Sequence, residues 1–263
     1  MRYKIILCYH GSGFSGWQRQ ANKPTVQGAV EDALLRLYGQ KISVTGSGRT
    51  DEGVHALGQV AHFDAPDTLP LHKIASALNF YLPKTVRIIS CETAPEDFHA
   101  IKSAKKKTYI YDMYTCAIEH PLLIDRALRL ERPIDTAQML QAAKLFVGTH
   151  DFLAFRCRGS SATTTVRTVY ECELKVFKDS EQRKPLATPF FCAPVDTHLR
   201  LKISANGFLY KMVRTVVGSL IKVGEGKLTL EDLQTRLSSA TEWQKKFTAD
   251  PCGLYLYSVE YNP

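Results

Sequence analysis

The sequence has no long apolar segment, although 44% of its 263 residues are hydrophobic. No stretch reaches the roughly 20 consecutive apolar residues that a membrane-spanning helix needs. The first residues, Met1 to Leu7, also lack the length and the cleavage site of a signal peptide. We therefore expect a cytoplasmic protein with no membrane partner, long enough to form two domains of ordinary size.

Cysteine is present, but not in the patterns that build structure. The seven cysteines form no CxxC pair, and their number is odd. Paired, closely spaced cysteines are typical of zinc sites, and an even number is typical of a disulfide framework. We therefore expect reduced thiols and no bound metal.

Several common catalytic motifs are also missing. The sequence contains no P-loop, no GxGxxG, no HExxH and no GxSxG, and its eight histidines show no metal-ligand spacing. These absences argue against nucleotide hydrolysis, zinc peptidase chemistry and the serine hydrolase triad. The chemistry has to come from other side chains.

The most distinctive segment is GRTDEGVHA, residues 48–56, between two expected strands at 42–46 and 59–64. Catalytic groups gather on such loops because the strands behind them hold their position. Its glycines allow positive φ or a close approach to a ligand. Asp51 and Arg49 are two residues apart, so in an extended chain they project on the same side. A weak surface ion pair on a polar loop is the alternative interpretation.

Asp51 is the strongest catalytic candidate, as a covalent nucleophile. A two-carboxylate glycosidase needs a second carboxyl group across a cleft, and the adjacent Glu52 would point away from Asp51 on an extended chain. A buried aspartate needs a nearby cation to stay ionised. Arg214 could supply it, because it interrupts an apolar stretch of an expected helix at 208–223, where an arginine usually has a buried partner.

Positive charge is in excess. Lysine and arginine outnumber aspartate and glutamate by 34 to 26, which favours a polyanionic partner. Tyr109 follows one group of lysines and could stack on a nucleic-acid base, although a core tyrosine is the commoner case. Hydroxyl and aromatic residues lie among the basic ones, which favours phosphate contacts over simple solvated faces. The two basic groups are Lys102, Lys105, Lys106 and Lys107, and Arg156, Arg158 and Arg167 around the loop at 160–165.

The order of expected elements is β-α-β-β-α-β, repeated with longer connections. This order predicts an α+β fold of two ferredoxin-like halves (split βαβ, as in RRM domains) with antiparallel sheets and an active-site cleft between them. The predicted domains are 1–104 and 105–263, and residues 178–197 are expected to form a loop. Strands are expected at 3–10, 42–46, 59–64, 85–91, 106–114, 166–177, 197–205 and 254–261, and helices between Thr25 and Gly39 and at 71–80, 135–146, 208–223 and 230–237.

Taken together, these motifs resemble the tRNA pseudouridine synthase A (TruA) family over nearly the whole chain. One of them alone is weak evidence, but their occurrence in this order is highly specific. They are Tyr9–Gly11, Gly16–Gln20, Gly48–Ala56, Phe98–Ala100, Lys107–Tyr109, His150–Phe152, Asn206–Arg214 and Gly253–Leu256. The segment at 178–197 is longer than the family pattern.

The resemblance implies an isomerase that converts uridine to pseudouridine at positions 38, 39 and 40 of the tRNA anticodon stem-loop, as a homodimer and without a cofactor. It implies that Asp51 is the nucleophile, that Tyr109 stacks on the uracil and removes the C5 proton, and that Arg214 pairs with Asp51. Arg49 would help to hold the extruded nucleotide. Lys107, Arg156 and Arg167 are expected to contact the RNA.

Two other functions remain open at this stage. The split βαβ order is also that of RRM domains, so the chain could bind RNA without catalysis, although the aromatic RRM motif is absent. A glycosidase that excises the base is disfavoured by the missing second carboxylate, and release of free uracil would favour it.

Overall fold

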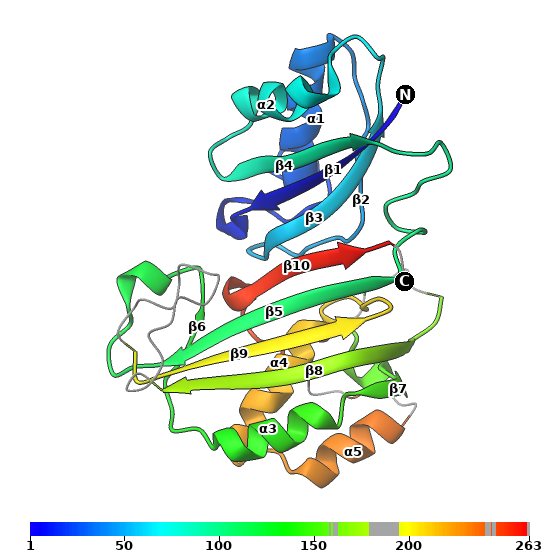
Figure 1. Ribbon diagram of the computed structural model, residues 1–263. Coiled ribbons are helices and arrows are strands. Elements are labelled where there is room, and N and C mark those ends of the chain that lie inside the picture. Colours follow the sequence, from blue (N-terminus) through cyan, green and yellow to red (C-terminus); the bar gives the residue numbers. More distant parts are fainter. Residues whose placement is uncertain (158, 160–162, 179–194, 240–242, 244–245, 262–263) are drawn as a thin grey trace. The chain divides into compact units, whose positions relative to one another are not determined.

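The computed structural model describes residues 1–157, 159, 163–178, 195–239, 243 and 246–261. The chain forms two compact units, drawn in Figure 1. Unit 1 contains Met1–Lys107 together with Tyr255–Pro263, and unit 2 contains Thr108–Leu254. The end of the chain therefore returns to the first unit. Separate domains at 1–104 and 105–263 stay a prediction.

Unit 1 follows the predicted β-α-β-β-α-β order. Its sheet has the order β4-β1-β3-β10, with β2 also paired to β3. The neighbours are antiparallel except for β10, which runs parallel to β3. Alternate residues of β1 are buried, so one face of the sheet carries the core. The elements are β1 (Arg2–Tyr9), η1 (Gly11–Gly13), α1 (Val26–Tyr38), β2 (Thr45–Gly46), β3 (His55–Asp64), α2 (Leu71–Tyr81), β4 (Val86–Thr93) and β10 (Leu254–Glu260).

Helix α1 begins and ends at the residues that the sequence indicates. Thr25 is its N-cap, and the side chain accepts a hydrogen bond of 3.2 Å from the amide of Gly28. Gly39 ends the helix in the left-handed conformation, with φ of 71°. Val30 and Leu34, on its apolar face, are completely buried.

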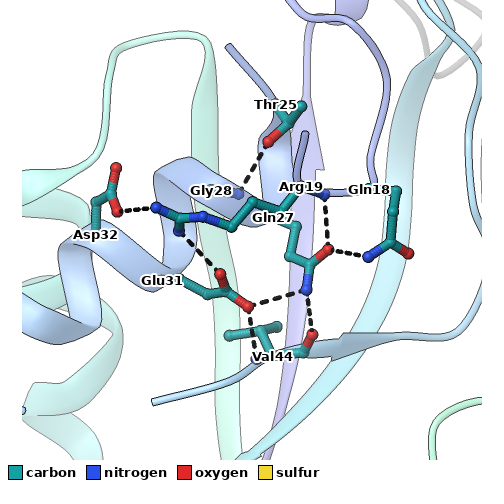
Figure 2. A network of polar contacts seen from close by, with 8 residues as sticks. All are labelled: Gln18, Arg19, Thr25, Gln27, Gly28, Glu31, Asp32 and Val44. Atoms are coloured by element: carbon teal, nitrogen blue, oxygen red, sulfur yellow. Dashed lines mark hydrogen bonds and ion pairs between the residues drawn. The ribbon is translucent and has the colours of Figure 1, made fainter. Parts of the chain in front are cut away.

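The strand predicted at 42–46 is wrong for most of its length, because only Thr45 and Gly46 pair with β3. The backbone of Val44 bonds to side chains of α1 and not to a neighbouring strand (Figure 2). Its amide donates to Glu31 at 3.1 Å, and its carbonyl accepts from Gln27 at 3.0 Å. Strand β3 begins at His55, so the last two residues of the motif at 48–56 belong to this strand and not to the loop that carries Asp51.

Unit 2 contains a sheet of order β5-β9-β8-β7, with β6 parallel to β5. Helix α3 contacts β8, α4 and α5. The elements are β5 (Lys106–Thr115, which begins in unit 1), η2 (Pro121–Leu123), β6 (Leu128–Leu130), α3 (Thr136–Lys144), β7 (Gly148–Asp151), η3 (Leu153–Phe155), β8 (Val166–Lys178), β9 (Thr197–Ala205), α4 (Met212–Gly224), α5 (Leu230–Ser238) and η5 (Pro251–Gly253). The fold is thus mixed α/β with mostly antiparallel pairing, and β3–β10 and β5–β6 correct the expectation of purely antiparallel sheets.

Two helix predictions in unit 2 need correction. Helix α4 begins at Met212 and not at 208, because Lys211 takes the left-handed conformation, with φ of 59°. Phe208 and Lys211 therefore precede the helix. The helix predicted at 135–146 ends earlier, at Lys144. Gly148, with φ of 115°, starts strand β7, which the sequence did not predict.

The described residues also bear on membranes, thiols and metals. None of the helices in the described ranges is both long and apolar enough to cross a membrane. The six cysteines that the structure describes are all free thiols. In that same part of the chain, no group of three or more His, Cys, Asp or Glu side chains is arranged to hold a metal ion. Most of the expected loop at 178–197 lies outside the described residues.

Candidate active site

Asp51 lies in the loop between β2 and β3, at the start of a tight turn. The amide of Val54 donates to the carbonyl of Asp51 at 3.1 Å, and Gly53 supplies the positive φ, 79°, inside that turn. Asp51 is half-buried, whereas Arg49 and Glu52 on either side are exposed. Of the two carboxylates in this loop, Asp51 is therefore the one that is partly shielded from solvent.

Side chains from β1 and β3 hold the first half of this loop. The amide group of Gln59 accepts from the backbone N–H of Gly48 at 3.3 Å and donates to the Gly48 carbonyl at 2.7 Å. The hydroxyl of Tyr9 shares a hydrogen bond of 2.8 Å with Thr50, and Gln59 also donates to that hydroxyl at 3.4 Å. Gln59 is fully buried, and burial raises the pKa of Tyr9. The bonds from Gln59 hold the backbone at Gly48, and the bond from Tyr9 holds the side chain of Thr50, the residue before Asp51.

The segment before α1 holds the loop from a second direction. The amide of Trp17 donates to the carbonyl of Thr50 at 3.0 Å. A Cβ added to Gly16 would lie 2.7 Å from that same carbonyl oxygen, and one added to Gly46 would lie 2.4 Å from the Trp17 ring. Glycine is therefore required at both positions for this close packing.

Helix α1 anchors that segment in turn through Gln27, as Figure 2 shows. Its side-chain oxygen accepts from the side chain of Gln18 at 2.8 Å and from the amide of Arg19 at 2.9 Å. Arg19 then pairs with Glu31 at 2.9 Å and with Asp32 at 3.1 Å. The chain from α1 through Gln27 to Trp17 thus supports the Asp51 loop.

The far end of the loop is held at His55. The amide of Gly11 donates to Nδ1 of His55 at 2.9 Å, so this imidazole carries its proton on Nε2 and is neutral. The ring stacks on Tyr255 with centroids 4.6 Å apart. A Cβ on Gly11 would lie 2.1 Å from the carbonyl oxygen of Val54, so the two backbones are in direct contact.

Lys107 contacts the loop at its first residue. Its ammonium donates to the carbonyl of Ser47, whose own amide donates to Val60 at 2.7 Å. Burial lowers the pKa of Lys107 from 10.5 to about 8. This lysine was predicted to contact RNA. In the structure its ammonium group is bonded to the backbone of unit 1.

In unit 2, Tyr109 is nearly buried on β5, with 8% of its surface exposed. The edge of one ring meets the face of the other where Tyr109 packs against Phe208, at 5.1 Å between centroids and 85° between planes. Tyr111 is a core residue, and its hydroxyl donates to the carbonyl of Asp250 at 2.6 Å. The two tyrosines of this strand therefore differ in environment.

Arg214 lies in the first turn of α4 and is half-buried. Its Nε donates to the carbonyl of Ala249 at 2.8 Å, and the amide of Ala249 donates back to the carbonyl of Arg214 at 3.0 Å. This reciprocal pair fixes the direction of the guanidinium group.

Of the other basic candidates, Arg167 has its side chain bonded within unit 2, and Arg156 is bonded there through its backbone. Arg167 donates to the carbonyls of Thr164 at 2.9 Å and Val166 at 2.6 Å, and burial lowers its pKa. The carbonyl of Arg156 accepts from Lys246 at 2.5 Å. Arg158 lies outside the described residues.

Comparison with known proteins identifies the family. The family model for tRNA pseudouridine synthase matches residues 5–101 and 142–262. The chain belongs to this family. A tRNA pseudouridine synthase A of Methylacidiphilum infernorum is 39% identical over 262 residues, covering 99% of this chain and 96% of the relative. That of Rhodopseudomonas palustris is 39% identical over 261 residues, 99% of both chains. That of a Thermoanaerobacter species is 35% identical over 257 residues, 98% of both.

The predicted family is thus confirmed, and with it membership of an isomerase family. The site residues divide between the two units of this pseudouridine synthase. Asp51, Arg49 and Lys107 belong to unit 1, and Tyr109 and Arg214 to unit 2, with Arg156 and Arg167. Within unit 1, Lys107 is bonded to the Asp51 loop. The pairing of Asp51 with Arg214 stays a prediction.

Sequence reasoning missed the residues that hold the loop. Gln59 had a signal: it is a polar side chain inside the apolar strand that follows the motif. Tyr9 belongs to the family motif Tyr9–Gly11, but nothing in that motif indicates its bond to Thr50. Gln27 had no signal, because its bonds join α1 to other segments of the chain.

Proposed function

We propose that this pseudouridine synthase family member isomerises uridine to pseudouridine in tRNA, at positions 38, 39 and 40 of the anticodon stem-loop. The observation that carries the proposal is the Asp51 loop, in which one carboxylate sits on a backbone bonded at Ser47, Gly48 and Thr50. A loop held in this way keeps a nucleophile in position without reorganisation. The relatives are tRNA pseudouridine synthases, which supports tRNA as the substrate.

Asp51 is the nucleophile in this proposal. Its carboxylate attacks the ribose C1′ as the bond from C1′ to N1 of the uracil breaks. The freed uracil rotates, its C5 bonds to C1′ and displaces the carboxylate, and the proton on C5 is lost while N1 gains one. Atoms and electrons balance without an oxidant or reductant, so the isomerisation needs no cofactor.

Two residues of unit 2 complete the site. Tyr109 stacks on the uracil and takes the C5 proton, a role supported by the edge contact with Phe208 that fixes its ring. Arg214 pairs with Asp51 and keeps it ionised. The bond from Arg214 to Ala249 supports this role, because it holds the guanidinium in one orientation.

A uridine inside a stem has to be extruded before Asp51 reaches its sugar, at a cost of a few kcal/mol. The exposed Arg49, two residues before Asp51, would hold the extruded nucleotide. Arg156 and Arg167 would contact tRNA phosphates, and the net charge of +8 favours that binding. A homodimer would offer the tRNA a larger basic surface.

We also propose that both units are variants of the ferredoxin-like fold. In unit 1 the supporting observation is the strand order β4-β1-β3 with β2 beyond β3. In unit 2 it is the order β5-β9-β8, together with helices that follow β5 and β9 along the chain.

Tritium release from tRNA labelled at uridine C5 tests the function. The wild type should release tritium with no added cofactor and no free uracil, and Asp51→Asn should release none while still binding tRNA. Glu52→Gln is the matched control, because it removes the exposed neighbouring carboxylate and should keep the activity. Tritium release by Asp51→Asn would exclude Asp51 as the nucleophile, and binding without any release by the wild type would favour an RNA-binding module.

A further inference from the structure

The four lysines before Tyr109 differ in what their side chains contact. Lys102 and Lys105 are exposed. Lys106 pairs with Glu260 at 3.0 Å on the surface of unit 1. Lys107 points to the opposite side of the strand from Lys106, and its ammonium bonds to the carbonyl of Ser47. One member of this basic group is therefore bound to the protein itself.

The Lys107 ammonium is an unusual group to bury. Within the part of the chain that the structure describes, no carboxylate pairs with it, and burial alone accounts for its lowered pKa. An unpaired buried ammonium is costly, and a methionine of similar length would fit an apolar site at lower cost. A lysine used for phosphate binding would keep its charge in solvent, as Lys102 does.

The partner of Lys107 explains why a cation is placed there. Ser47 directly follows the last residue of β2 and is the first residue of the Asp51 loop, and it is 1% exposed. Its amide is already bonded to Val60, and the next residue, Gly48, is bonded to Gln59 through both backbone groups. Lys107 thus adds a charge-assisted bond at the entry of the loop, four residues before Asp51.

We infer that Lys107 is a positioning residue, which holds the Asp51 loop by its first carbonyl group, and that it does not bind tRNA phosphate. This inference rests on the proposed function, since it assigns Lys107 to the geometry of the nucleophile. Loss of the bond lets the backbone before Asp51 shift, and a displacement of about 1 Å lowers a reaction rate about 100-fold.

The test compares Lys107→Met and Lys107→Arg with the wild type. Turnover of tRNA labelled at uridine C5 gives kcat and KM, and filter binding at several salt concentrations gives Kd and its salt dependence. Lys107→Met should lower kcat by about 10- to 100-fold and leave KM, Kd and the salt slope close to wild type. Lys107→Arg keeps a cationic donor and should recover part of kcat.

Lys102→Met is the matched comparison, because it removes an exposed lysine of the same group. If Lys107→Met raises Kd and lowers the salt slope by about one, Lys107 is a phosphate contact and the inference is wrong. An unchanged kcat in Lys107→Met would also overturn it. If Lys107→Met does not fold, Lys107→Gln, which keeps a neutral donor, takes its place. It should also lower kcat and leave KM, Kd and the salt slope close to wild type. A wild type that forms no pseudouridine would instead refute the proposed function.

Discussion

Replacing Lys107 by methionine should change how the stability of unit 1 depends on pH. The pKa of Lys107 falls from 10.5 in the unfolded chain to about 8 in the fold, because the ammonium is buried. Between these two values the unfolded state binds more protons than the native state, so the free energy of unfolding rises with pH. The full difference corresponds to about 3 kcal/mol.

The quantity to measure is the wild-type free energy of unfolding minus that of Lys107→Met. Groups that titrate alike in both proteins cancel, so the difference should stay flat below pH 8 and then rise by about 1.4 kcal/mol per pH unit up to about pH 10.5. Nearby titrating groups should not mask this rise. Burial raises the pKa of Tyr261 to about 12, and burial lowers that of His62 below its usual 6.5.

Tryptophan fluorescence can follow unit 1 alone. The chain has two tryptophans, and Trp17 is buried against Gly46 beside the Asp51 loop. In a Trp243→Phe background, urea unfolding at pH 7, 8, 9 and 10 therefore reports on Trp17. A difference between the two proteins that does not vary with pH would show that Lys107 is not desolvated, and would remove the reason for treating it as a buried group.

Three further predictions concern the loop and unit 2. Gly11→Ala should destabilise unit 1 by about 3 kcal/mol or more, because the new Cβ would meet the carbonyl of Val54. Gly13→Ala, where a Cβ meets nothing within 4 Å, should change urea unfolding by less than about 1 kcal/mol, and equal effects would contradict this packing. Arg214→Lys keeps the charge but loses the oriented guanidinium, so kcat should fall by about 100-fold, and normal turnover would exclude the pairing with Asp51. Tyr109→Phe keeps the ring and removes the phenol that is proposed to take the C5 proton, so tritium release should slow by about 100-fold or more. Release at the wild-type rate would exclude the phenol as the base.

The parts of the fold that the sequence predicted well are those governed by local signals. Thr25 and Gly39 bound α1 because a cap and a left-handed glycine act on their own helix. The strand predicted at 197–205 is β9 to the residue, Thr197–Ala205. In its middle, Leu199, Leu201 and Ile203 are completely buried and the residues between them are half-buried, which is the two-residue period that the sequence shows.

The parts that failed depend on contacts between distant segments. Helix α4 starts late because the preceding loop is held outside it: the amide of Cys157 bonds to the carbonyl of Tyr210, and Lys211 is left-handed. The strand at 42–46 is cut short because Gln27 and Glu31 take the hydrogen bonds of Val44. The residues next to these positions in the sequence do not indicate which distant residue will form the hydrogen bond.

The same reasoning explains which part of the candidate site could be predicted. Asp51 could be predicted because a segment rich in glycine and charge between two strands is a local pattern. Tyr109 and Arg214 were predicted from the family motifs in which they lie. Lys107 was predicted to contact RNA because it lies in a group of lysines. That criterion does not distinguish an exposed charge from a buried one. The structure separates them, since Lys106 pairs at the surface and Lys107 bonds to Ser47.

The bonds around Asp51 also show why its loop needs so many supports. The loop from Ser47 to Gly53 contains only small, polar and charged residues, so it has little apolar surface to bury, and packing alone would leave it mobile. Gln59 and Trp17 replace packing with hydrogen bonds to the backbone at Gly48 and Thr50. Each such bond contributes only about 1 kcal/mol to stability, but each fixes a different backbone group. Their value therefore lies in restricting where the carboxylate can go, and removing one should affect turnover more than folding.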